Sequence, residues 1–367
     1  MLKKALAIVV IYSLFGGCSN KLNILAPYKE SVSVYGLLDT TDAISYIRVE
    51  RVFLGAGNAY TMAQNPDSVY FTSGELTVSL QRWNLYTGAQ VSVDVPASAN
   101  MQIVLTDTLM QLEAGTFNQN ARIYKTNHRL YAYDTNCVYK LIIQNNKTGK
   151  QYTAQTPMVA DFQLIDVSGV DNAIGPAYGS GTSSNPLNIV PGNQGVVTCQ
   201  YNSPVNAGVC SLTMRLFYTE NDGGINNPKY VDLGLGTYYP SSTVGGLNQT
   251  FDYLGTSLLS YIAAAIPVPA RPSITRTADS VEFLLIAGGP NLALYNQVNA
   301  ATPLSQNVPN YTNISGGIGV FSSRYQKSIG RILSSSFNQA CLDTLAGSSI
   351  TCKLQFLNYN GTLVPCQ

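Results

Sequence analysis

Six cysteines beyond residue 100 are the residues whose type and spacing could most directly do chemistry in this sequence. They are Cys137, Cys199, Cys210, Cys341, Cys352 and Cys366. In an exported chain, which folds in an oxidising compartment, an even number of cysteines indicates disulfide bonds, although six cysteines allow many pairings. Buried thiols without bridges are the alternative interpretation.

Alternate residues of a strand point to opposite faces, and this side-chain parity narrows the choice of disulfide partners. Cys199 and Cys210 lie in neighbouring segments with alternating apolar residues, and each falls on the apolar side of its segment. This pattern predicts a bridge across a hairpin. Cys341 and Cys352 have the same separation, and Cys352 falls on the apolar face of a strand predicted over residues 349–358. The predicted disulfides are Cys199–Cys210 and Cys341–Cys352, with Cys137–Cys366 following by elimination.

Catalytic groups of the common kinds are scarce. Hydrolysis by a serine nucleophile needs a histidine base, and His128, in a polar turn, is the only histidine of the chain. No G-x-S-x-G elbow is present. No C-x-x-C pair accompanies the histidine, so the sequence also predicts no metal centre and no cofactor. We expect that the protein is not an enzyme. The enzymatic alternative is a glycosidase that uses two of the 20 acidic residues as catalytic carboxyl groups.

Aromatic side chains are the most suggestive groups for ligand binding, because the chain has 24 tyrosines and one tryptophan. Trp83 lies on the same face of its predicted strand as polar residues, which predicts an exposed ring. Flat rings flanked by Asn and Ser can stack on sugars while the amides bond hydroxyl groups. The candidate platform residues are Trp83, Tyr218, Tyr238 and Tyr239. The alternative is that Trp83 fills a bulge or plugs a domain interface.

The first 18 residues have the pattern of an export signal. Two lysines precede an apolar run over residues 5–15, and Gly16-Gly17-Cys18 follows. The run is short for a membrane span. The small pair before the cysteine resembles the lipobox of bacterial lipoproteins, although Phe15 is larger than the usual residue there. We expect cleavage of residues 1–17 and lipidation of Cys18, which anchors the chain in a membrane; an ordinary secretory signal is the alternative.

Composition and patterning predict a mainly β protein with two domains. Charged residues make up 11% of the chain and the formal net charge is +1, so no electrostatic footprint for nucleic acid is present. Residues 18–29 are expected to be a tether. Short alternating segments over residues 30–158 predict an immunoglobulin-like antiparallel sandwich. Residues 159–367 are expected to form a β-rich α+β domain with two or three short helices.

The helices are predicted from spacing and from proline positions. Apolar residues between 251 and 262 fall on one helical face, and this helix should stop before Pro267. Pro290 suits the first turn of a second helix, which would run through Asn299. A third short helix is predicted over residues 336–345.

Four short stretches resemble those of a known family. They are Val34–Leu38, Phe53–Ala59, Thr153–Pro157 and Gly316–Tyr325. Together with the start of the chain, they resemble an uncharacterised family of Bacteroidota outer-membrane lipoproteins, a domain-of-unknown-function family often encoded near TonB-dependent receptors. The resemblance covers nearly all of the chain after the leader. It implies an outer-membrane location and a receptor partner, and it supplies no catalytic residue.

The expected function is therefore that of an accessory or interaction module of an outer-membrane receptor system. The alternative is a surface protein that binds a glycan or a peptide through Tyr and Trp platforms. The sequence leaves open which face of the outer membrane the protein occupies.

Overall fold

The computed structural model describes residues 30–52, 61, 64–111, 120–132, 135–162, 164–169, 172–174, 196–300, 311–333 and 337–366. Strands dominate, with a few short helices, so the predicted mainly β class is confirmed. The predicted leader, the lipidated Cys18 and the tether lie outside the described residues. Within the described ranges, no helix has the length and apolarity needed to span a bilayer.

The first module is a sandwich of two sheets. One sheet contains β1 (Ser31–Asp39), β2 (Ser45–Val52), β7 (Asn120–Thr126) and β6 (Thr106–Gln111), in that order. The other contains β4 (Gln90–Val91), β3 (Leu76–Asn84), β8 (Cys137–Asn145) and β9 (Gln151–Pro157), and β5 (Gln102–Val104) also pairs with β3. With the immunoglobulin letters assigned in chain order, β1, β2, β3 and β4 are A, B, C and C′, and β6, β7, β8 and β9 are D, E, F and G. The two sheets then have the orders A-B-E-D and C′-C-F-G, which is the arrangement of an immunoglobulin-type sandwich. The predicted fold of this region is confirmed.

The second module repeats most of that strand order. One sheet has the order β11 (Asn172–Ile174), β10 (Leu164–Gly169), β12 (Val196–Asn202), β15 (Asn248–Leu254). The other has β14 (Ile225–Tyr238), β13 (Val209–Asp222), β16 (Thr275–Gly288) and β17 (Ile318–Leu333). In the same lettering these are A-B-E, with the short β11 added at the edge, and C′-C-F-G. The second module is thus a related sandwich to which helices have been added.

The three predicted helices are present in the second module. They are α4 (Gly255–Ala265), α5 (Pro290–Ala300) and α6 (Gln339–Gly347), and a fourth, short helix, α3 (Pro66–Val69), lies in the first module. Helix α4 starts later than its apolar spacing predicted, because Phe251 lies in β15 and pairs with Cys199 of β12. The strand predicted over residues 349–358 is wrong: a 3₁₀ turn, η2 (Cys352–Leu354), occupies this region.

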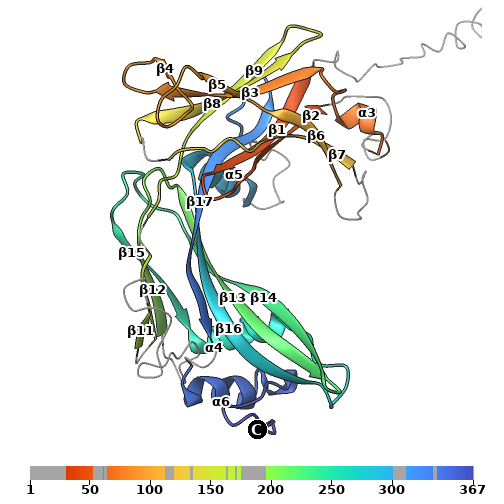
Figure 1. The fold of residues 1–367 in the computed structure, drawn as a ribbon. Helices are drawn as coiled ribbons and strands as arrows, with labels where there is room; N and C mark the ends of the chain where they lie inside the picture. The colour runs from red at the N-terminus through yellow and green to blue at the C-terminus, as the bar shows by residue number, and fades with distance from the viewer. Residues whose placement is uncertain are drawn as a thin grey trace, which may run out of the picture.

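Strand β17 joins the two modules in one continuous sheet of eight strands (Figure 1). Its first half pairs in parallel with β1, from Ser33↔Ile318 to Asp39↔Arg324, and its second half pairs antiparallel with β16. The sheet order is β14-β13-β16-β17-β1-β2-β7-β6. Residues 318–324, which the sequence places in the domain 159–367, therefore complete a sheet of the first module. The expected boundary after residue 158 does not separate the two modules in space.

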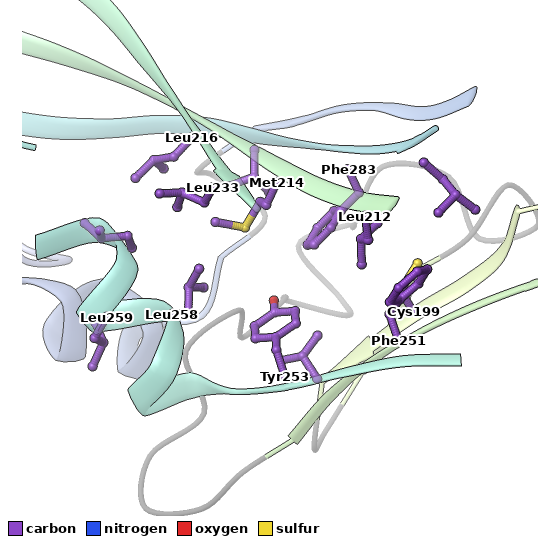
Figure 2. Packing of buried hydrophobic residues seen from close by; sticks show 14 of the residues in the cluster. Cys199, Leu212, Met214, Leu216, Leu233, Phe251, Tyr253, Leu258, Leu259 and Phe283 are labelled. Atoms are coloured by element: carbon purple, nitrogen blue, oxygen red, sulfur yellow. The ribbon is translucent and has the colours of Figure 1, made fainter. Parts of the chain in front are cut away.

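Both hydrophobic cores lie on the same face of this eight-stranded sheet. Phe321 belongs to the first core and Tyr325 packs against the second. Residues four apart on a strand point to the same side, so the two smaller sheets cover one face side by side. In the second core, Leu212 and Phe283 face Tyr253, and Leu258 of α4 lies between the layers (Figure 2). The opposite face, here called the open face, carries no second sheet in the described chain.

The cysteine pairing differs from every predicted bridge. Cys352 is bonded to Cys366, with 5.3 Å between their Cα atoms, and the other four described cysteines are buried thiols. Cys199 and Cys210 lie on β12 and β13, which belong to opposite sheets and do not form a hairpin. Cys341 lies on α6. The predictions Cys199–Cys210, Cys341–Cys352 and Cys137–Cys366 are therefore wrong, because strand parity does not reveal which strand lies alongside.

Candidate functional site

The four aromatic residues singled out in the sequence do not form one platform. Trp83 lies half-buried on the outer face of the sheet that contains β3 and β8. Tyr218 is only 5% exposed, because its ring packs edge-on against Phe356 in the second module. Tyr238 packs against the second core, and Tyr239 is 38% exposed. Trp83 and the three tyrosines thus belong to different modules, which corrects the predicted common site.

The only histidine is engaged in a surface contact. The Nε2 atom of His128 lies 2.7 Å from Oδ1 of Asp94, and its Nδ1 atom lies 3.0 Å from the carbonyl oxygen of Arg129. Hydrogen bonds from Ser98 and His128 lower the pKa of the Asp94 carboxyl. No cluster of three metal-ligating side chains occurs within the described ranges.

A hollow on the open face brings together residues that the sequence did not single out. Gly36 of β1 pairs with Ile47 of β2. This register places Tyr35 and Tyr46 diagonally on the same side of the two strands, at a separation that aromatic side chains can bridge. Their side chains are 48% and 43% exposed. Two tyrosine rings therefore flank one stretch of the open face.

The floor of the hollow is aliphatic. Leu37 of β1, Met110 of β6 and Ile123 of β7 line it, and Ile44 forms a partly exposed wall. The hollow has a volume of about 260 Å³. Several of these side chains keep apolar surface in contact with water in the isolated chain, which makes the hollow a favourable place for an apolar group of a partner.

The rim of the hollow consists of paired charges. The guanidinium of Arg324 donates to Oδ2 of Asp39 and to Oδ2 of Asp42, each at 2.9 Å. Partial burial by itself lowers the pKa of Arg324, but the hydrogen bonds with Asp42 and Asp39 outweigh burial and raise it. Arg48 donates to Glu50 at 2.8 Å. These contacts order the rim, and its two arginines and three carboxylates leave a net charge of −1.

The hollow has the composition of a binding site. Tyrosine, arginine and methionine are enriched at protein interfaces, and tyrosine and arginine are the residues on which binding energy concentrates. Strand parity gave a partial signal, because Tyr35 and Tyr46 alternate with buried Val34 and Ile47. Sequence alone gave no signal that Arg324 would join them.

A second charged cluster, around Glu75, is structural. The buried carboxylate of Glu75 accepts two hydrogen bonds from Arg51, at 2.7 and 2.8 Å, and one from Lys147 at 3.1 Å. The backbone N–H of Thr72, at 3.1 Å, and its hydroxyl, at 2.6 Å, also donate to it. Burial alone raises the pKa of Glu75, but these hydrogen bonds outweigh burial and lower it to about 2. The cluster ties β2 and β3 to the β8–β9 turn.

This low pKa predicts an acid-sensitive contribution to stability. The folded-state pKa lies below the ordinary value of 4.5, so the contribution is present above pH 4.5 and is lost as the pH falls toward 2. The shift corresponds to roughly 3 kcal/mol, and screening at the partly exposed partners leaves about 2 kcal/mol. We expect Glu75→Gln to lower the free energy of unfolding by about 2 kcal/mol at neutral pH.

Urea unfolding measured across this pH range tests the prediction. The difference in unfolding free energy between the wild type and Glu75→Gln should shrink as the pH falls through the window. A difference that stays constant down to pH 2 would contradict the assignment.

Comparisons with known proteins do not assign the chain to a family. No protein-family model matches it, and no curated protein sequence shows significant similarity to it. The functional argument therefore depends on the residues of this chain.

Proposed function

We propose that this protein is a non-enzymatic lipoprotein of the cell envelope, anchored in the outer membrane through acyl chains on Cys18. In this proposal it is an accessory or interaction module of an outer-membrane receptor system, and its partner protein docks on the open face. The observation that carries the docking proposal is the hollow between Tyr35 and Tyr46. The lipobox-like start of the chain and the resemblance to Bacteroidota lipoproteins support the location and the kind of partner.

The hollow favours a protein partner for physical reasons. Its aliphatic floor can take up an apolar side chain, and burial of apolar surface is worth about 25 cal/mol per Å². The two tyrosines offer large rigid rings that lose little conformational entropy on binding. The rim, with a net charge of only −1, gives orientation through hydrogen bonds and does not require a strongly charged partner.

Removing both rings should strongly weaken docking. We expect a double variant that carries both Tyr35→Ala and Tyr46→Ala to weaken partner binding at least thirtyfold. The reason is that a central aromatic anchor commonly contributes about 2 kcal/mol or more to the free energy of binding. The measurement is co-purification of the full-length protein with its partner from detergent-solubilised membranes of the native host. Tyr86→Ala is the matched control, because Tyr86 is 83% exposed in the β3–β4 turn, away from the hollow.

Two outcomes would contradict the proposal. Equal recovery of the same partner by the wild type and the double variant would show that the partner does not dock at the hollow. In the same preparations, mass spectrometry of the N-terminal peptide should find an acylated Cys18. An unmodified thiol would contradict the proposed lipid anchor in the outer membrane.

A further inference from the structure

A second surface, on the opposite side of the first module, has a different chemistry. Strands β3, β8 and β9 turn one row of side chains each away from the first core. The outward residues include Gln81, Trp83, Lys140, Gln144, Thr153 and Gln155. Among the outward side chains of these three strands, only Lys140 is charged. This amide-rich surface, here called the glutamine face, lies across the sandwich from the hollow.

Trp83 is held in a fixed orientation on the glutamine face. Its Nε1–H donates to Oε1 of Gln81 at 3.0 Å, and Nζ of Lys140 lies 5.1 Å from the ring centroid. Gln81 pairs across the ladder with Lys140, and Lys140 pairs with Gln155. Trp83 itself pairs with Gln90 of β4 and with the apolar Val138 of β8, so its ring has amide and ammonium groups on some sides and an aliphatic neighbour on another.

We infer that the glutamine face binds an uncharged oligosaccharide, with one sugar ring stacked on Trp83. A pyranose has an apolar C–H face and an edge of hydroxyl groups, so it needs an aromatic surface next to groups that both donate and accept. Gln81 supplies such an amide beside the ring, and Gln155, two strands away on β9, supplies one for a neighbouring sugar unit. Strongly charged ligands are disfavoured, because Lys140 is the sole charge among these outward residues and it lies over Trp83. This site goes beyond the proposed docking function and does not share residues with it.

The position of the tryptophan makes the test direct. The chain contains one tryptophan, so its intrinsic fluorescence reports on Trp83 alone. The probes are cellohexaose, xylohexaose and mannohexaose, titrated into the full chain up to millimolar concentrations. We expect a saturable change in intensity or emission maximum with at least one of them, because a stacked sugar displaces water and Lys140 from the ring.

Matched variants separate binding at this face from other effects. We expect Gln81→Ala and Gln155→Ala each to weaken binding by roughly five- to tenfold, as lost hydrogen bonds between neutral groups do. The double variant Tyr35→Ala and Tyr46→Ala should bind the sugar like the wild type, so failure of the docking proposal leaves this result unaffected. Calorimetry with Trp83→Ala should show no binding, and its circular dichroism spectrum serves as the check on folding.

The inference is overturned if none of the three oligosaccharides changes the fluorescence. It is also overturned if the two glutamine variants bind as tightly as the wild type. A fluorescence response to a sugar-free peptide, without one to the oligosaccharides, would reassign the glutamine face to a polypeptide partner.

Discussion

Replacement of Gly319 by alanine is expected to break the parallel ladder that joins the two modules. Gly319 lies at the start of β17 with a φ of +109°, a conformation that residues with a side chain rarely adopt. A Cβ atom there would lie 2.0 Å from the carbonyl oxygen of Val34. Val34 is opposite Gly319 in the β1–β17 ladder, so alanine would have to push the two strands apart.

The expected loss is a large part of the total stability. Backbone strain at such a position costs about 1–3 kcal/mol, and the clash adds to it, so we expect a loss above about 4 kcal/mol. Domains are commonly stable by only about 5–15 kcal/mol. Urea unfolding should therefore show a strongly lowered midpoint, or a separate early transition as the modules come apart.

Gly234→Ala is the matched control for this experiment. Gly234 lies in β14 of the same eight-stranded sheet, but nothing lies within 4 Å of a Cβ atom built there. We expect its unfolding midpoint to stay close to that of the wild type, with a change below about 1 kcal/mol. Similar midpoints for Gly319→Ala and Gly234→Ala would show that the close approach at Val34 does not hold the modules together.

Replacement of Arg276 by leucine is expected to loosen the attachment of the C-terminal segment to the second module. Arg276 is only 2% exposed at the start of β16. Its Nε and Nη2 atoms donate to Oε2 of Glu220 at 3.0 and 2.8 Å, and its Nη1 atom donates to the carbonyl oxygen of Leu354 at 3.0 Å. The backbone N–H of Leu357 also donates to the Arg276 carbonyl oxygen at 2.7 Å. The Arg276 side chain thus ties β13 and the turn η2 to β16, whereas the backbone contact with Leu357 does not depend on it.

Leucine would leave polar groups without partners in a buried place. Hydrogen bonds from Lys229 and Arg276 lower the pKa of Glu220, and only Lys229 would remain. The carbonyl oxygen of Leu354 would lose its donor from the guanidinium. Breaking a buried ion pair by removing one partner costs roughly 3–5 kcal/mol, and we expect about 3 kcal/mol because Glu220 stays paired with Lys229.

Hydrogen exchange locates this effect. Amides over residues 352–357 should lose protection in Arg276→Leu, while the first module exchanges as in the wild type. Arg271→Leu is the control, because Arg271 is 64% exposed and its pairing with Asp222 lies at the surface, where such pairs contribute about 0–1 kcal/mol. Unchanged protection over residues 352–357 would show that Arg276 does not hold the C-terminal segment.

The candidate sites show how far local patterns reach. Parity predicted an outward-facing Trp83, and the structure places its side chain on the outer face of its sheet. Tyr218 was named for the platform as an aromatic residue and not from its parity, and it lies in the buried row of β13 with Leu216 and Met214. The hollow was missed because its walls come from β1, β2, β6 and β7, and its rim includes Arg324, which is 285 residues from Asp39.

The sequence by itself determined the local elements of this protein. Alternation over residues 30–158 determined the strands of the first sandwich, Pro290 determined the start of α5, and Asn146–Gly149 determined the turn between β8 and β9. These features depend on neighbours within a few residues, where side-chain periodicity and backbone preference act.

Only the tertiary structure decided which of these elements lie side by side. Strand β17 lies between β16 and β1, Cys352 meets Cys366, and two sandwiches of related strand order share one sheet although no repeat is visible in the sequence. The physical reason is that alternation specifies which side of a strand faces a core, but not which strand is its neighbour. The neighbour is selected by the packing of the complete cores and by contacts such as the close approach of Gly319 to Val34, which exist only in the folded chain.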